Sequence, residues 1–138
     1  MRKLFVLTAL LLFAGFAFGQ SLQKGAVLAI RNSNELVLKP NVSMNQYLDV
    51  MMNKWAPEMQ KLFPGTKMII LKGNRGTMAN GYAWVWYFES EAVRAKYFTP
   101  EGGLVDESLG VKMQEANKIL YEYAIDLGFE DYTDWIVL

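Results

Sequence analysis

The sequence contains neither cysteine nor histidine among its 138 residues. Without cysteine, the chain forms no disulfides, no thiolate metal sites and no cysteine nucleophile. Without histidine, it lacks the commonest metal ligand and the commonest general base of proteins. The acidic residues show no metal-binding spacing, and we expect the cluster of Glu130, Asp131 and Asp134 to be solvated surface. The sequence therefore predicts no metal and no cofactor.

The sequence also has no excess charge of either sign, with 14 Lys and Arg residues against 14 Asp and Glu residues. Nucleic acids and anionic membranes attract proteins with a positive surplus, so we expect neither as a partner. Hydrophobic residues make up 52% of the chain and aromatic residues 14%. This composition predicts a single domain, over residues 20–138, with a core of its own.

Residues 1–19 are typical of a secretory signal peptide. Arg2 and Lys3 precede an uncharged apolar run from Leu4 to Phe18, and small residues flank Phe18 at the expected cleavage site. An uncleaved membrane anchor is the alternative, but the run is shorter than the roughly 20 residues that a spanning helix needs. We predict a soluble protein that is exported to the periplasm or secreted, and that has no membrane contact after cleavage before Gln20.

The first half of the mature chain predicts a strand, an extended segment, a helix and another strand. The strand covers residues 25–31 and the extended segment residues 35–39, either as a hairpin or as one bulged strand. Ser43 and Gln46 form a capping box that begins a helix ending at residues 63–65. Pro57 should kink or split this helix near Ala56. Residues 66–72 predict the next strand.

The second half predicts a strand, two helices and a last strand. Residues 81–89 alternate aromatic and aliphatic side chains and are apolar on both faces, which is typical of a central strand. Ser90 should cap a helix over residues 91–98, and Thr99 and Pro100 resemble the start of another. Helical spacing continues from Leu109 to Leu127 and stops at Gly128. Residues 132–138 alternate as a strand.

This order predicts an α+β fold: a ferredoxin-like β-α-β-β-α-β arrangement with an antiparallel sheet and helices on one face. The helices can cover only one face of the apolar central strand. We therefore expect a second copy of the chain to cover the other face, giving a homodimer. The sequence does not decide whether Trp84 or Val85 faces that partner.

Two segments give the chain a resemblance to a known superfamily. Residues 36–40 (Leu-Val-Leu-Lys-Pro) precede the capped helix, and residues 84–90 (Trp-Val-Trp-Tyr-Phe-Glu-Ser) precede the next helical region. In these it resembles the dimeric α/β-barrel superfamily, which includes antibiotic-biosynthesis-monooxygenase-like domains. The resemblance implies a site for small apolar or aromatic ligands between sheet and helices. Some members are cofactor-independent oxygenases. Others degrade haem bound through a histidine, which this chain lacks.

The candidate site residues lie on the predicted helix and the aromatic strand. Trp55, Trp84 and Trp86 would form the walls, and Tyr47, Asn53 and Arg31 would lie at the rim. Arg31, with Lys72 and Arg75, lies near a strand end and could orient a carboxylate or simply be solvated. The alternatives are a cofactor-independent oxygenase, and a structural or interaction module whose aromatic residues only fill the core. A cavity of several hundred Å³ would favour a ligand, and a filled interior would favour the module.

Overall fold

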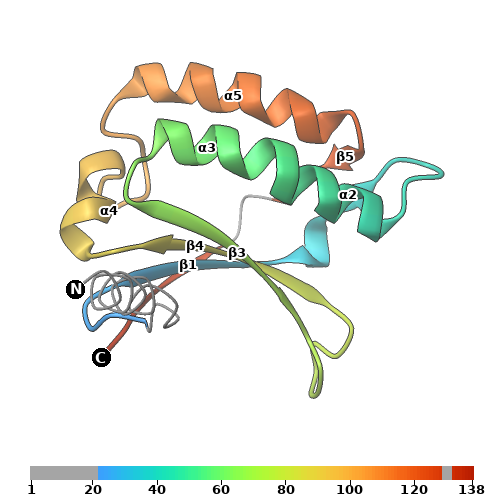
Figure 1. Cartoon of the computed structure of the whole chain (residues 1–138), viewed down its shortest axis with the longest axis horizontal. Helices are drawn as coiled ribbons and strands as arrows, with labels where there is room; N and C mark the ends of the chain where they lie inside the picture. The colour runs from blue at the N-terminus through green and yellow to red at the C-terminus, as the bar shows by residue number, and fades with distance from the viewer. Residues whose placement is uncertain (1–21, 129–131) are drawn as a thin grey trace, which may run out of the picture.

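The computed structural model describes residues 22–128 and 132–138. An antiparallel sheet carries its helices on one face (Figure 1). Its strand order is β3-β4-β1-β6, formed by Val27–Asn32 (β1), Thr66–Lys72 (β3), Tyr82–Phe88 (β4) and Thr133–Ile136 (β6). This is the predicted α+β, ferredoxin-like architecture, with the aromatic strand β4 in the interior of the sheet. The predicted signal peptide and the acidic residues Glu130 and Asp131 lie outside the described residues.

The segment after β1 differs from both predicted arrangements. A 3-10 turn, η2 (Ser33–Glu35), follows β1, and β2 (Val37–Leu38) then pairs with β5 (Ala124–Asp126) in a separate two-stranded sheet. Residues 25–39 are therefore neither a hairpin nor a bulged strand. The partner of β2 lies far along the chain, and local sequence carries no signal for such a pairing.

The same pairing explains why the last helix is shorter than predicted. Helix α5 (Glu107–Tyr121) ends before the expected stop at Gly128, because residues 124–126 form β5. Gly128 does not end the helix, and its conformation has a different cause. Its φ is +60°, and a Cβ placed there would lie 2.8 Å from the backbone carbon of Glu35. Glycine is thus required where the chain passes close to η2.

The first helical rod has the predicted start and an interruption of an unexpected kind. The Ser43 side chain accepts from the Gln46 N–H, and the Gln46 side chain accepts from the Ser43 N–H, which confirms the capping box. The rod contains α2 (Met44–Val50), a π-helical turn η3 (Met51–Trp55) and α3 (Ala56–Leu62). Pro57, which has no N–H to donate, is the second residue of α3. The rod therefore changes from π to α at Ala56, where the sequence predicted a kink or split.

Ser90 caps α4 (Glu91–Tyr97) as predicted, by accepting from the Val93 N–H at 3.2 Å. The prediction of a further helix from Thr99 is wrong. The Thr99 N–H donates to the Gly103 carbonyl at 2.7 Å, and a bridge joins Phe98 to Leu104. These bonds hold residues 99–103 in a tight turn, which is an alternative use of Pro and Gly at such positions.

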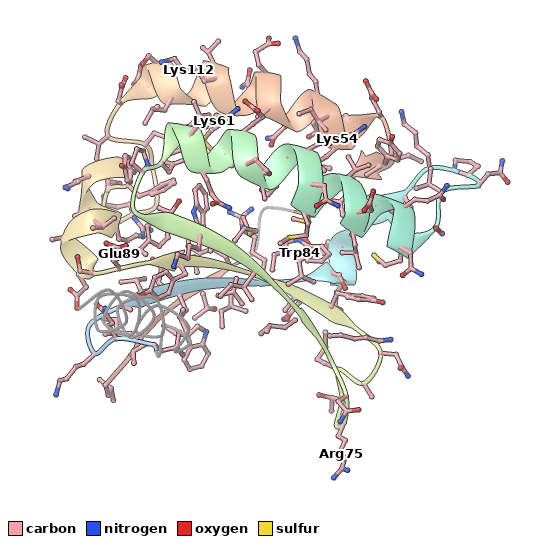
Figure 2. The ribbon with its side chains drawn as sticks, in the orientation of Figure 1. Lys54, Lys61, Arg75, Trp84, Glu89 and Lys112 are labelled. Carbon is pink, nitrogen blue, oxygen red and sulfur yellow. The ribbon has the colours of Figure 1, made fainter. Side chains whose placement is uncertain are left out.

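Strand register decides which face of the sheet each side chain occupies. Trp84 lies between the sheet and the helices (Figure 2) and belongs to the core cluster with Tyr47, Trp55 and Leu120. Val85, the next residue along β4, is therefore on the opposite face. Ile69, Leu71 and Trp135 are exposed residues of that opposite face. Among the described residues, no helix has the length and apolar character that crossing a membrane requires.

Candidate functional site

A cavity of about 80 Å³ lies between the helix-covered face of the sheet and the helices. Its apolar walls come from strands, helices and one turn, because alternate residues of the strands point toward the helical layer. The aromatic wall residues are Trp55, Trp84, Trp86, Phe88 and Phe98. Three flexible side chains, Met59, Met68 and Met113, complete the walls. Methionine adapts its shape readily, so this part of the cavity can adjust to an occupant.

A cluster of rings holds part of the aromatic wall rigid. Phe63 packs edge-on against Trp86, with ring centroids 4.9 Å apart, and stacks on Phe98 at 5.6 Å. Trp86 stacks in turn on Phe88 at 5.4 Å. Aromatic pairs at these separations contribute beyond their buried area. This part of the aromatic wall is thus a fixed surface, in contrast to the methionine side.

Trp84 lines the cavity and also carries a buried polar group. It is only 3% exposed, and its Nε1 has no hydrogen-bond partner among the described residues. An unsatisfied buried donor costs about 1–3 kcal/mol, so such groups need an explanation. An acceptor supplied by a bound molecule would satisfy this N–H.

The indole N–H of Trp55, unlike that of Trp84, has a hydrogen-bond partner. Its Nε1 donates to Oδ1 of Asn117, a residue of α5, at 2.9 Å, and both residues line the cavity. Because an indole N–H can only donate, this bond fixes the orientation of the Asn117 amide. The amide oxygen faces Trp55, and the amide NH₂ remains a donor. The π-helical turn of Trp55 therefore positions a polar group on the other helix.

Charged side chains gather at one side of the cavity. Arg94 of α4 pairs with Asp134 of β6 through Nε and Nη2, each at 2.9 Å. Its Nη1 donates to the Thr99 carbonyl at 3.3 Å, and its Nη2 also donates to the Tyr132 hydroxyl at 3.4 Å. The Arg31 guanidinium lies 5.2 Å from the centre of the Tyr132 ring. Burial lowers the pKa of Arg31, an effect that Tyr132 and Asp134 oppose. The cavity thus combines an apolar interior with a charged margin.

Gly102 makes room for Tyr132 at this margin. A Cβ on Gly102 would lie 2.3 Å from the Tyr132 hydroxyl oxygen, and the φ of Gly102 is +88°. Glycine is therefore needed for both the backbone conformation and the close approach. The missing side chain of Gly102 leaves space for the Tyr132 hydroxyl.

The structure brings four of the six candidate residues together in the cavity lining: Trp55, Trp84, Trp86 and Arg31. Tyr47 is instead fully buried in the core beside Trp84, with ring centroids 6.2 Å apart, and burial raises the pKa of its phenol. Asn53 is exposed on the outside of the rod, where it donates to Asp49 at 2.7 Å. Neither residue lies at the rim of the cavity, because their positions around the helix axis direct both side chains elsewhere.

Sequence reasoning missed Arg94, Asn117 and Tyr132, and it assigned Asp134 to solvated surface. Asn117 had one usable signal, because it follows Met113 by four residues on the buried side of α5, where a polar residue is unusual. Arg94 and Asp134 are 40 residues apart and no local pattern relates them. Among the residues that the structure describes, no group of three or more His, Cys, Asp or Glu side chains is placed to hold a metal ion.

Comparison with known proteins finds no matching family model and no matching curated relative. Three solved structures are similar. The first is a dimeric protein of unknown function with a ferredoxin-like fold from Bacteroides fragilis, with 17% identity, a TM-score of 0.41 and coverage of 84% of this chain and 99% of that chain. The second is an uncharacterised NIPSNAP-like domain protein from Burkholderia xenovorans, with 14% identity and a TM-score of 0.43. The match covers 84% of this chain and 86% of that chain.

The third is a candidate antibiotic biosynthesis monooxygenase from Bacteroides thetaiotaomicron, with 10% identity, a TM-score of 0.35 and coverage of 82% and 86%. The neighbours thus include the ferredoxin-like and monooxygenase-like proteins that the sequence resembles. These similarities concern the fold, which in this class hosts many functions.

Proposed function

We propose that the chain binds a small aromatic ligand in the cavity between the sheet and the helices. The observation that carries this proposal is the buried Nε1 of Trp84, a residue of the cavity lining, which lacks a hydrogen-bond partner among the described residues. A ring would stack against the fixed aromatic wall, and an acceptor on the ligand would satisfy the indole N–H. Apolar walls with a few converging polar groups are typical of ligand sites.

The size of the cavity limits the ligand. Its volume of about 80 Å³ is well below the roughly 300–1,000 Å³ of sites for drug-sized molecules, but the interior is not completely filled. Benzene occupies an engineered cavity of about 150 Å³. The cavity is smaller than that, so a single ring needs the side chains of Met59, Met68 or Met113 to move, and we propose a ligand of that size.

Titration of single-ring aromatic compounds, followed by tryptophan fluorescence, tests the proposal. Three of the four tryptophans line the cavity, so an occupant should change the emission. Trp84→Phe keeps a ring but removes the N–H, and it should weaken binding about threefold to tenfold, the value of one hydrogen bond. Trp135→Phe is the matched control, because Trp135 is 58% exposed outside the cavity and its loss should leave affinity unchanged.

Failure of every compound to change the emission would favour the structural module. The same conclusion would follow if Trp84→Phe and Trp135→Phe changed binding equally, because the cavity would then have no special part in it. Circular dichroism of each variant separates a loss of affinity from a loss of fold.

We further propose that the protein is exported. The support is the order of cationic, apolar and small residues in positions 1–19. Mass spectrometry of the mature protein from its native host should find an N-terminus near Gln20. An intact Met1 in the membrane fraction would contradict export by cleavage.

The face of the sheet opposite the helices supports a third proposal, pairing with a second copy of the chain. Trp135, Leu28 and Tyr87 form one cross-strand row on this face, which ends at Lys67 on β3, and Ile69 and Leu71 are further apolar residues of β3 on the same face. Among the described strand residues there, Lys67 is the only charged one. A face with so little charge suits an identical apolar face better than a charged partner, and a two-fold axis provides that match.

A further inference from the structure

The amide of Asn117 is an oriented hydrogen-bond donor in the cavity lining. Asn117 is half-buried on α5, and its Oδ1 accepts from the Trp55 Nε1 at 2.9 Å. Since an indole nitrogen can only donate, the amide oxygen and not the NH₂ must face Trp55. The NH₂ has no hydrogen-bond partner among the described residues. Asn117 therefore has two N–H groups left for an occupant of the cavity.

The charged groups of the lining, in contrast, already have partners. All three guanidinium nitrogens of Arg94 donate, two of them to Asp134 and the third to the Thr99 carbonyl. The Arg31 guanidinium lies over the Tyr132 ring, 5.2 Å from its centre. An ion enters an apolar cavity only where an opposite charge or several hydrogen bonds replace its hydration. Because no charged group of the described lining is without a partner, the lining favours a neutral ligand.

The remaining polar groups of the lining favour a carbonyl over a hydroxyl. Besides the Asn117 NH₂, the buried N–H of Trp84 is a donor without a partner among the described residues. The side-chain acceptors are already in use, because the Asn117 oxygen accepts from Trp55 and the Asp134 carboxylate accepts from Arg94. A carbonyl oxygen only accepts, whereas a hydroxyl must also donate. A donor that finds no acceptor in an apolar cavity is unfavourable.

We infer that the ligand is a neutral single-ring aromatic compound with a carbonyl group, whose oxygen accepts from the Asn117 NH₂ while its ring packs against the aromatic wall. This inference rests on the proposed function, because it concerns the same cavity. It adds Asn117 as the residue that selects the polar group of the ligand.

Isothermal titration with four ring compounds of similar size tests the inference. Acetophenone carries the carbonyl, 1-phenylethanol has a hydroxyl in its place, α-methylstyrene has no polar atom, and benzoate has a charge. The wild type should bind acetophenone at least about threefold more tightly than 1-phenylethanol or benzoate, which is the scale of one hydrogen bond.

Asn117→Asp tests the donor directly, since aspartate keeps an oxygen for the Trp55 N–H but has no NH₂. It should weaken the binding of acetophenone at least about threefold. The affinity for α-methylstyrene, which has no acceptor to lose a bond, should stay within about twofold. Asn74→Asp is the matched control, because it makes the same change at an exposed residue next to Arg75, away from the cavity (Figure 2). It should change neither affinity.

An unchanged affinity of Asn117→Asp for acetophenone, or an equal loss for acetophenone and α-methylstyrene, would overturn the inference and leave the proposed ligand site standing. Binding of 1-phenylethanol or benzoate as tight as that of acetophenone would do the same. That comparison needs only the wild type, so it decides the question even if circular dichroism shows that Asn117→Asp does not fold. Binding of none of the four compounds would reject the inference together with a site for single rings.

Discussion

Replacing Phe63 with alanine should lower the free energy of unfolding by about 3–5 kcal/mol, the usual cost of truncating a buried aromatic residue. Phe63 is 0% exposed, at the end of the first helical rod. Its ring contacts three others, those of Trp86, Tyr97 and Phe98. Because two of these rings line the cavity, the substitution should also weaken any ring-dependent binding there.

Urea denaturation monitored by circular dichroism measures the stability change. Phe63→Leu, which keeps most of the volume, should cost clearly less than alanine. Tyr121→Ala removes a comparable ring that is 49% exposed on α5, and it should cost less than about 1 kcal/mol. A Phe63→Ala effect no larger than this control would show that the aromatic cluster does not organise the core.

Replacing Trp135 with lysine should convert the mature protein from a dimer to a folded monomer. Trp135 is 58% exposed within one chain, so lysine there costs one copy little. In the proposed pair, the same position would be buried on both copies, and an unpaired buried charge is strongly unfavourable. Multi-angle light scattering at micromolar concentration should therefore report two copies for the wild type and one for the variant.

Val111→Lys provides the control for this experiment, because Val111 is 64% exposed on α5, in the helical layer. It should leave the dimer intact. A wild-type mature chain that is monomeric at these concentrations would reject the proposed pairing. Dissociation by both lysine variants would indicate that added charge, and not this particular face, controls association.

The sequence by itself determined the elements whose signals are local. Ser43 and Gln46 cap α2 because their bonds span only three residues. The alternation in residues 82–88 encodes a strand with two apolar faces, and only an interior position in the sheet covers both. The order of such elements limits the topologies to a few, so the ferredoxin-like sheet was also predictable.

The tertiary structure alone decided where those elements stop and which side chains meet. Helical spacing continues beyond Tyr121 in the sequence. Residues 124–126 instead form a strand that pairs with β2, and α5 therefore ends at Tyr121. The polar margin of the cavity joins Arg31, Arg94, Asn117, Tyr132 and Asp134 from distant parts of the chain. Spacing along one element cannot report such contacts, because they depend on strand register and helix rotation. Those are fixed only when the whole core packs.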